Sequence, residues 1–228
     1  MCFAECGHAV VPSGCSEATL TALAADFDRL VEGSSTPYAV RGVLQQSPCV
    51  RAVAGDLLAV ASSLLGAECV VSKATYFDKT HENNWLVPWH QDLTITVQQQ
   101  HSVPGFEHWR QKHDASMWQR GIWHVQPPES ILSRIVALRL HIDRCSGDNG
   151  ALRVLPGTHR FGVLSADAIA QHEADGEAET LAAERGEIVA MAPLLLHASS
   201  KSQQPARRRV LHLEFCAAEL PAPLAWHG

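Results

Sequence analysis

Residues 134–155 read RIVALRLHIDRCSGDNGALRVL, and this stretch sets the character of the chain. Its first part, 134–142, is rich in Val, Ile and Leu and predicts a buried strand, and 151–155 predicts a second one. Asp148-Asn149-Gly150 lies between them and is typical of a turn, because Asn and Gly adopt the backbone conformations that tight turns need. The stretch therefore predicts a β-protein built from short strands joined by turns.

The rest of the chain extends this pattern. Residues 16–32 have apolar side chains at helical spacing after a capping Ser16, and 50–65 form a second such segment that ends at Gly66. Two helices followed by many non-local strands predict an α+β chain with a double-stranded β-helix (jelly-roll, cupin-like) core and flanking N-terminal helices. Further strands are predicted over 69–77, 92–98, 187–191 and 208–216, and a helical excursion over 164–184.

Length and composition restrict the class of protein. The chain has 228 residues, 46% of them hydrophobic, so we expect residues 1–228 to form one domain with 1–66 as a helical flank. A formal net charge of −6 argues against nucleic acid as a partner, because nucleic-acid-binding proteins usually present a basic face. No apolar run reaches the roughly 20 residues of a membrane span. The first residues lack the pattern of a signal peptide.

The seven cysteines are odd in number and scattered along the chain. This distribution predicts free thiols in a reducing compartment, and hence a cytoplasmic protein, rather than a disulfide framework. Cys2, Cys6 and His8 offer an alternative reading as zinc ligands, but their spacing is not that of a zinc finger.

Two distant segments carry residues that suit a metal. One is Pro88-Trp89-His90-Gln91-Asp92, and the other is the apolar run that contains His197. On a strand, His90 and Asp92 share one face because side chains alternate. Two imidazoles and one carboxylate form the facial triad that binds non-haem Fe(II) and leaves coordination positions open.

A His-x-Asp pair alone is a weak signal, since His141-Ile142-Asp143 has the same spacing. We interpret that second pair as the end of a strand leading into a turn. The first pair gains weight from Arg208, which lies on the strand predicted after His197. A guanidinium rarely points into a protein without a carboxylate partner, and a dicarboxylate cosubstrate would supply one. Strand alternation places the neighbouring Arg207 and Arg209 on the opposite face.

Residues 98–133 show no sustained helical or strand period. A structureless segment of this length in a compact domain is usually functional, so we interpret it as a lid or substrate loop. We expect Trp109, Trp118 and Trp123 to form aromatic walls for the substrate, and Arg120 to provide a polar contact.

Three blocks of sequence resemble a known family. They are PWHQD at 88–92, DNGALRVLPGTHRFG at 148–162, and the His197-x-Ser199 segment followed by Arg208. With these blocks in this order, the chain resembles the phytanoyl-CoA dioxygenase family of Fe(II)- and 2-oxoglutarate-dependent oxygenases. The resemblance implies Fe(II) held by His90, Asp92 and His197.

The resemblance also implies a cosubstrate site. The distal carboxylate of 2-oxoglutarate is expected to meet Arg208 and Ser199. A further contact is expected from the strand before the His-x-Asp pair, for which Lys73, Thr75 and Lys79 are candidates.

The implied activity is an O₂-dependent hydroxylation of an unactivated C–H bond, with release of succinate and CO₂. Asp92 favours hydroxylation, because related halogenases carry a small residue at that place. The acidic net charge favours a small or medium polar metabolite over an acyl-CoA, whose phosphates need a basic surface. A monomer or homodimer is expected. Two alternatives are a cupin that uses another metal and a non-catalytic jelly-roll binding module.

Overall fold

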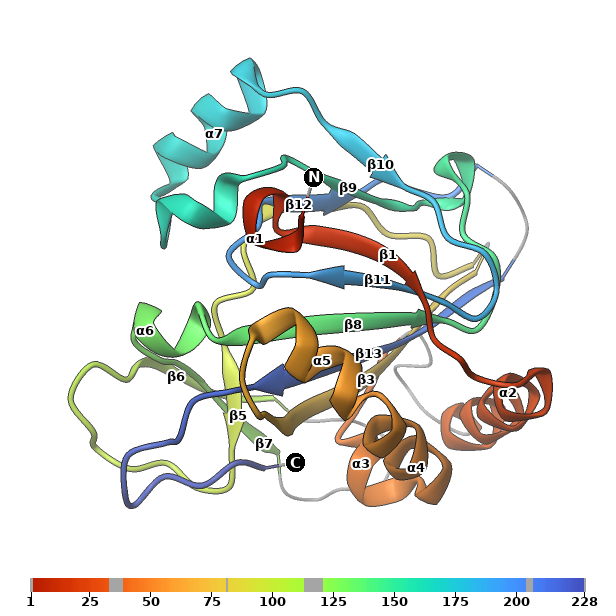
Figure 1. Cartoon of the computed structure of the whole chain (residues 1–228), viewed down its shortest axis with the longest axis horizontal. Coiled ribbons are helices and arrows are strands. Elements are labelled where there is room, and N and C mark those ends of the chain that lie inside the picture. Colours follow the sequence, from red (N-terminus) through yellow and green to blue (C-terminus); the bar gives the residue numbers. More distant parts are fainter. Residues whose placement is uncertain (1, 33–38, 81, 113–120, 204–206, 228) are drawn as a thin grey trace.

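The computed structural model describes residues 2–32, 39–80, 82–112, 121–203 and 207–227. Within these ranges, two antiparallel sheets pack face to face, and a smaller third sheet extends from one end (Figure 1). The predicted jelly-roll core with flanking N-terminal helices is confirmed.

The larger sheet has six strands in the order β1-β11-β8-β13-β3-β2. Along β13, odd-numbered apolar residues such as Leu211 and Leu213 face outward, whereas Arg208, His212 and Glu214 face the opposite sheet. This alternation places a polar surface inside the roll. The strands are β1 (His8–Pro12), β11 (Glu187–Met191), β8 (Ile135–His141), β13 (Arg208–Cys216), β3 (Val70–Lys79) and β2 (Ala39–Arg41).

The facing sheet has four short strands in the order β10-β9-β12-β4. Its apolar residues, among them Leu152 and Val154, pack against Val189 and Met191 of the larger sheet and close one end of the roll. The strands are β10 (Glu179–Leu181), β9 (Leu152–Val154), β12 (His197–Ser199) and β4 (Val87–His90).

Helices cover the outer face of the larger sheet (Figure 1). In α2 (Glu17–Val31) the Ser16 side chain accepts a hydrogen bond from the Thr19 backbone and caps the helix. Its apolar stripe packs on the sheet, where Phe27 meets Tyr76 edge to face at 4.5 Å between ring centroids.

The segment predicted as one helix over 50–65 is two helices, and that prediction was wrong. α4 (Pro48–Asp56) and α5 (Leu58–Leu65) meet at a 42° bend around Leu57, just after Gly55, a weak helix former. A short α3 (Val43–Gln46) precedes them. In the described residues no single helix is long and apolar enough to cross a membrane, and the bent pair α4–α5 passes that test by length and composition only.

The sequence predicted a helical flank over 1–66, but the described part of this flank also contains two strands. After α1 (Phe3–Cys6), β1 pairs with β11, and β2 pairs with β3, so the flank supplies both edge strands of the larger sheet. These strands are too short to show a clear alternating pattern. The described residues show no metal-ligand group at Cys2, Cys6 and His8, because Cys6 Sγ instead contacts backbone carbonyls.

The described parts of the segment 98–133, namely 98–112 and 121–133, contain more regular structure than predicted. It contains β6 (Glu107–Lys112), β7 (Ile122–Gln126) and α6 (Glu129–Leu132), and its strands join β5 (Ile95–Val97) in the third sheet. The pattern was missed because β6 is largely exposed and polar, so it lacks the apolar alternation that marks a half-buried strand. The excursion 164–184 contains α7 (Ala166–Asp175) followed by β10.

Candidate metal and cosubstrate site

Three side chains that can bind a metal converge where β4 meets β12. His90 and His197 are direct partners in the sheet register, and their ring centroids lie 4.1 Å apart. Asp92 follows the end of β4, with one carboxylate oxygen 3.6 Å from His197 Nε2 and the other 3.9 Å from His90 Nε2. The three ligand atoms lie within 4.8 Å of one another, a spacing that one cation can bridge.

The backbone sets the tautomer of both histidines. His90 Nδ1 lies 2.8 Å from the Pro88 carbonyl, and His197 Nδ1 lies 2.9 Å from the Leu195 carbonyl. A carbonyl only accepts hydrogen bonds, so each Nδ1 donates, and each Nε2 is the nitrogen that faces Asp92 and remains for a metal. Burial lowers the pKa of His197 to about 4, although the Asp92 charge opposes the shift, so the ring is neutral at pH 7.

Asp92 is ionised at the same pH. Burial alone would raise the pKa of its carboxyl, but its linked titration with His197 and the charge of Lys73 outweigh burial and lower the pKa. Two imidazoles and one carboxylate are a donor set that fits Fe(II).

Gln91 holds the loop that carries Asp92. Its side chain points away from the metal ligands and donates to the carbonyls of Gly162 at 2.8 Å and Leu194 at 2.7 Å. Its amide oxygen accepts the backbone N–H of Leu164 at 2.8 Å. Because β4 ends at His90, these bonds and the hydrogen bond from the Asp92 N–H to the Pro193 carbonyl at 2.9 Å, rather than strand alternation, hold Asp92 in place.

The triad opens into a cleft of about 210 Å³ between the two main sheets. One side of the cleft carries the metal-binding residues, and the other carries two arginines and a histidine from the larger sheet. The lining residues are Lys73, Phe77, Trp85, Val87, His90, Asp92, Arg139, Leu152, His197, Ala198, Ser199, Arg208 and His212.

The structure places Arg208 in this cleft and both of its neighbours outside it. Arg207 pairs with Asp78 at 2.7 Å, and Arg209 pairs with Asp143 at 2.9 Å. Arg208 is 4% exposed, donates from Nη1 to the Gly150 carbonyl at 2.7 Å, and has no partner for Nε in the described part of the chain. A buried guanidinium with an unused donor is suited to a carboxylate ligand.

Lys79 and Ser199 lie near Arg208, and of the two Ser199 lines the cleft. The fully buried Lys79 ammonium donates to the Ser200 carbonyl at 2.7 Å and contacts Ser199 Oγ at 3.4 Å. Gly150 has a φ of 70°, and a Cβ there would lie 2.8 Å from the Ser200 carbonyl and 3.1 Å from Lys79 Nζ. The turn predicted from Asp148 to Gly150 therefore brings Arg208 and Lys79 together, and only glycine fits its last position.

A polar chain that we had not predicted crosses the inner face of the larger sheet. Lys73 Nζ bonds Glu214 at 2.6 Å, His212 Nε2 lies 3.1 Å from the same carboxylate oxygen, and Arg139 Nη1 lies 3.0 Å from His212 Nδ1. A guanidinium only donates, so His212 accepts at Nδ1 and donates from Nε2 to Glu214. The sequence contained a signal for this chain, because charged or polar residues recur at two-residue intervals within the apolar runs that form β8 and β13.

Asp92, His212 and Glu214 form a second group with metal-binding atoms in close proximity. This group fits a cation poorly. The Lys73 ammonium already neutralises Glu214, and both ring nitrogens of His212 have hydrogen-bond partners.

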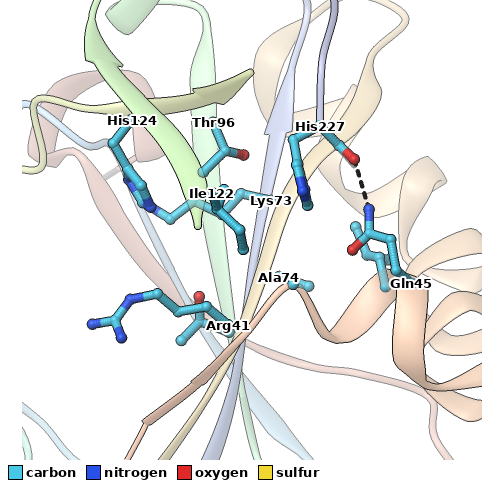
Figure 2. Close-up of a pocket in the computed structure, with 11 residues that line it drawn as sticks. Arg41, Gln45, Lys73, Ala74, Thr96, Ile122, His124 and His227 are labelled. Atoms are coloured by element: carbon cyan, nitrogen blue, oxygen red, sulfur yellow. Dashed lines mark hydrogen bonds between the residues drawn. The ribbon is translucent and has the colours of Figure 1, made fainter. Parts of the chain in front are cut away.

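Thr75 faces a separate and much smaller pocket, shown in Figure 2. About 10 Å³ of free space remains there, enough for about one water molecule. His124 lines this pocket, buried and without a partner for either ring nitrogen among the described residues. Lys73 lies between the two pockets, so of the three candidates on β3 only Lys73 lines the main cleft and only Lys79 lies beside Arg208.

The aromatic residues expected to contact substrate are placed elsewhere. Trp109 and Trp123 pack edge to face, with 6.3 Å between ring centroids, as partly buried side chains against the core of the third sheet, and neither lines the cleft. Their apolar surface is used within that sheet. Trp118 and Arg120 lie outside the described residues.

Comparison with known proteins gives the family. The sequence profile of the phytanoyl-CoA dioxygenase (PhyH) family matches residues 3–210. Comparison with curated protein sequences gave no match.

Similar solved structures share the fold at low sequence identity. AviO1 from Streptomyces viridochromogenes Tue57 has a TM-score of 0.69 at 21% identity, over 97% of this chain and 95% of that one. EctD from S. alaskensis with 2-oxoglutarate and 5-hydroxyectoine has 0.69 at 19% identity, over 94% and 73%. HygX from Streptomyces hygroscopicus with nickel and 2-oxoglutarate bound has 0.64 at 12% identity, over 95% and 84%. The chain belongs to the phytanoyl-CoA dioxygenase family and is an Fe(II)- and 2-oxoglutarate-dependent oxygenase that uses O₂ and acts on a small molecule.

Proposed function

We propose that His90, Asp92 and His197 hold the Fe(II) of this oxygenase, and that Arg208 binds the distal carboxylate of 2-oxoglutarate with help from Ser199 and Lys79. The observation that carries this proposal is a single cleft with two features. It holds the Nε2 atoms of two histidines beside an ionised Asp92, and it holds a buried guanidinium whose Nε has no partner among the described residues. When bound, iron and 2-oxoglutarate activate O₂ for oxidation of a C–H bond, with succinate and CO₂ as by-products.

The reaction we propose is hydroxylation of an unactivated C–H bond in a small or medium polar metabolite. A cleft of about 210 Å³ suits a small molecule, and its charged wall favours a polar one. Phe77, Trp85 and Leu152 supply apolar surface that excludes water around the reacting carbon.

We further propose that residues 1–228 act as one domain, as a monomer or homodimer, in the cytoplasm. All seven cysteines are free, which suits a reducing compartment. The net charge of −6 supports the expectation of no nucleic-acid partner, and we expect no membrane partner. We propose no role in substrate binding for Trp109 or Trp123, because neither lines the cleft.

The test is anaerobic titration of the purified protein with Fe(II) and 2-oxoglutarate, followed by the visible charge-transfer band of the chelated cosubstrate. We expect the band in the parent protein, its loss in His197→Ala, and a much higher 2-oxoglutarate requirement in Arg208→Ala. Truncating one partner of a buried, hydrogen-bonded charge pair typically costs about 2–5 kcal/mol, or at least about 30-fold in affinity.

Arg207→Ala is the matched control, because its side chain is adjacent in sequence but pairs with Asp28 and Asp78 outside the cleft. If the parent gave no band at any 2-oxoglutarate concentration, the site assignment would be refuted and a cupin that uses another metal would be favoured. A band without succinate formation would favour a binding module.

A further inference from the structure

Arg139 is a cation in the cleft for which neither the described residues nor the proposed iron and cosubstrate supply an anion. It extends from β8 into the cleft, and no carboxylate of the described residues lies within salt-bridge distance of it. Nη1 donates to His212, and the described residues provide no partner for the buried Nε. Among the described residues Nε and Nη2 therefore have no hydrogen-bond partner, and this edge of a guanidinium is the one that can hold a carboxylate through two parallel hydrogen bonds.

The other charges of the cleft can be matched in pairs. Lys73 is paired with Glu214 at 2.6 Å. In the proposed complex, Asp92 and the keto-acid carboxylate of 2-oxoglutarate balance the two charges of Fe(II). The distal carboxylate is taken by Arg208. The neighbouring Lys79 does not line the cleft, and its ammonium donates to the Ser200 carbonyl. 2-Oxoglutarate has no third carboxylate, so Arg139 requires an anion from another molecule.

The surroundings of Arg139 hold its guanidinium in place. His212 accepts from Nη1, Glu214 accepts from His212, and Lys73 neutralises Glu214. On another side, the guanidinium carbon lies 5.9 Å from the centroid of the Phe77 ring. Burial, together with repulsion from Arg208, lowers the pKa of Arg139 to about 10, so the group stays charged at pH 7 and its charge is stabilised by an anion.

We propose that Arg139 binds a carboxylate of the substrate, so that this oxygenase acts on a small carboxylic acid held by its anionic end. This inference rests on the proposed function, because the pairing of the other charges assumes iron and 2-oxoglutarate in the cleft. His212, Glu214 and Lys73 are positioning residues that orient the guanidinium.

The experiment uses protein loaded anaerobically with Fe(II) and saturating 2-oxoglutarate, so that no turnover occurs. The probes are matched pairs of an acid and its neutral amide, namely butyrate with butyramide and benzoate with benzamide, at constant ionic strength. Binding is followed by perturbation of the charge-transfer band and by the melting temperature. We expect each acid to bind at least about tenfold more tightly than its amide, as a charge-assisted hydrogen bond implies.

Arg139→Gln should abolish the preference for acids while the 2-oxoglutarate band persists. Arg139→Lys keeps the charge without the paired donors and should retain part of the preference, which separates anion recognition from a general loss of folding. Arg134→Gln, an exposed position at the start of the same segment, is the control and should behave as the parent.

Equal binding of acid and amide by the parent would overturn the inference, as would an unchanged preference in Arg139→Gln. If Arg139→Gln weakened 2-oxoglutarate binding as strongly as Arg208→Gln, Arg139 would be a cosubstrate residue and the inference would also be wrong. Failure of the proposed function is distinguishable from all of these, because the parent would then give no charge-transfer band at all.

Discussion

Replacing Gln91 with Ala tests the link between the fold and the metal site. The substitution removes two buried hydrogen bonds and one partly buried one, and leaves two carbonyls and one backbone N–H without their partner. An unmet buried polar group costs about 1–3 kcal/mol, but water can enter the space that the side chain vacates and satisfy part of this demand. We therefore expect a loss of about 3 kcal/mol in the free energy of unfolding.

The same change should weaken metal binding, because the lost bonds hold the loop on which Asp92 lies. Residues that orient metal ligands typically affect affinity by about 10–100-fold. Urea unfolding of the metal-free protein measures the first effect, and anaerobic Fe(II) titration measures the second.

Two further variants sharpen this test. Gln99→Ala, at an exposed position, should change stability by less than about 0.5 kcal/mol. The carboxylate of Gln91→Glu can still accept from the Leu164 N–H, but it cannot donate to the Gly162 and Leu194 carbonyls, and its negative charge repels their oxygens. This variant should therefore be at least as destabilising as Gln91→Ala. If Gln91→Ala matched the parent in both stability and metal affinity, the reasoning would be refuted.

Three other predictions follow from buried groups. Burial, reinforced by the charge of Arg208, lowers the pKa of Lys79 to about 8, so the folded protein releases this proton before the unfolded chain does. Between pH 7 and 9 the free energy of unfolding of the metal-free protein should therefore rise. Over the same range the affinity for 2-oxoglutarate should fall, because Lys79 loses its positive charge. Calorimetry of Lys79→Met should show neither trend. Glu214→Gln leaves the buried Lys73 ammonium without its carboxylate and should lower the free energy of unfolding, measured in urea, by about 3–5 kcal/mol. Adding Lys73→Met to this variant should restore part of the loss. Phe27→Ala removes a fully buried ring that packs on Tyr76 and should cost about 3–5 kcal/mol, yet Fe(II) titration of the remaining folded protein should match the parent.

Sequence patterns were sufficient for the elements whose periodicity is local. The strands that became β3, β8, β11 and β13 are long or strongly apolar, and α2 has both a capping serine and an apolar stripe. Elements with few buried residues were missed, among them the edge strands β1 and β2 and the exposed β6, because a short or polar strand has no alternation to detect.

The same distinction holds for the site. The residue types and spacing of His90, Asp92, His197 and Arg208 were readable in the chain, because a metal-binding set needs particular donors and an inward arginine needs an anion. The sequence also showed polar residues, Arg139 and His212 among them, at two-residue intervals along two strands. This spacing alone does not tell which face of a strand points into the roll or which residues of the facing sheet lie opposite.

The sequence by itself determined the class of fold, the family and the candidate metal ligands, because each depends on local periodicity or on a motif. Only the tertiary structure decided that Gln91 holds the ligand loop and that Thr75 faces a different pocket. It also placed Trp109 and Trp123 against the core of the third sheet rather than in the cleft, and left Arg139 without a carboxylate partner among the described residues. The physical reason is that these facts depend on strand pairing between residues far apart in the chain, and a pairing register is set by the packing of whole sheets rather than by neighbours in sequence.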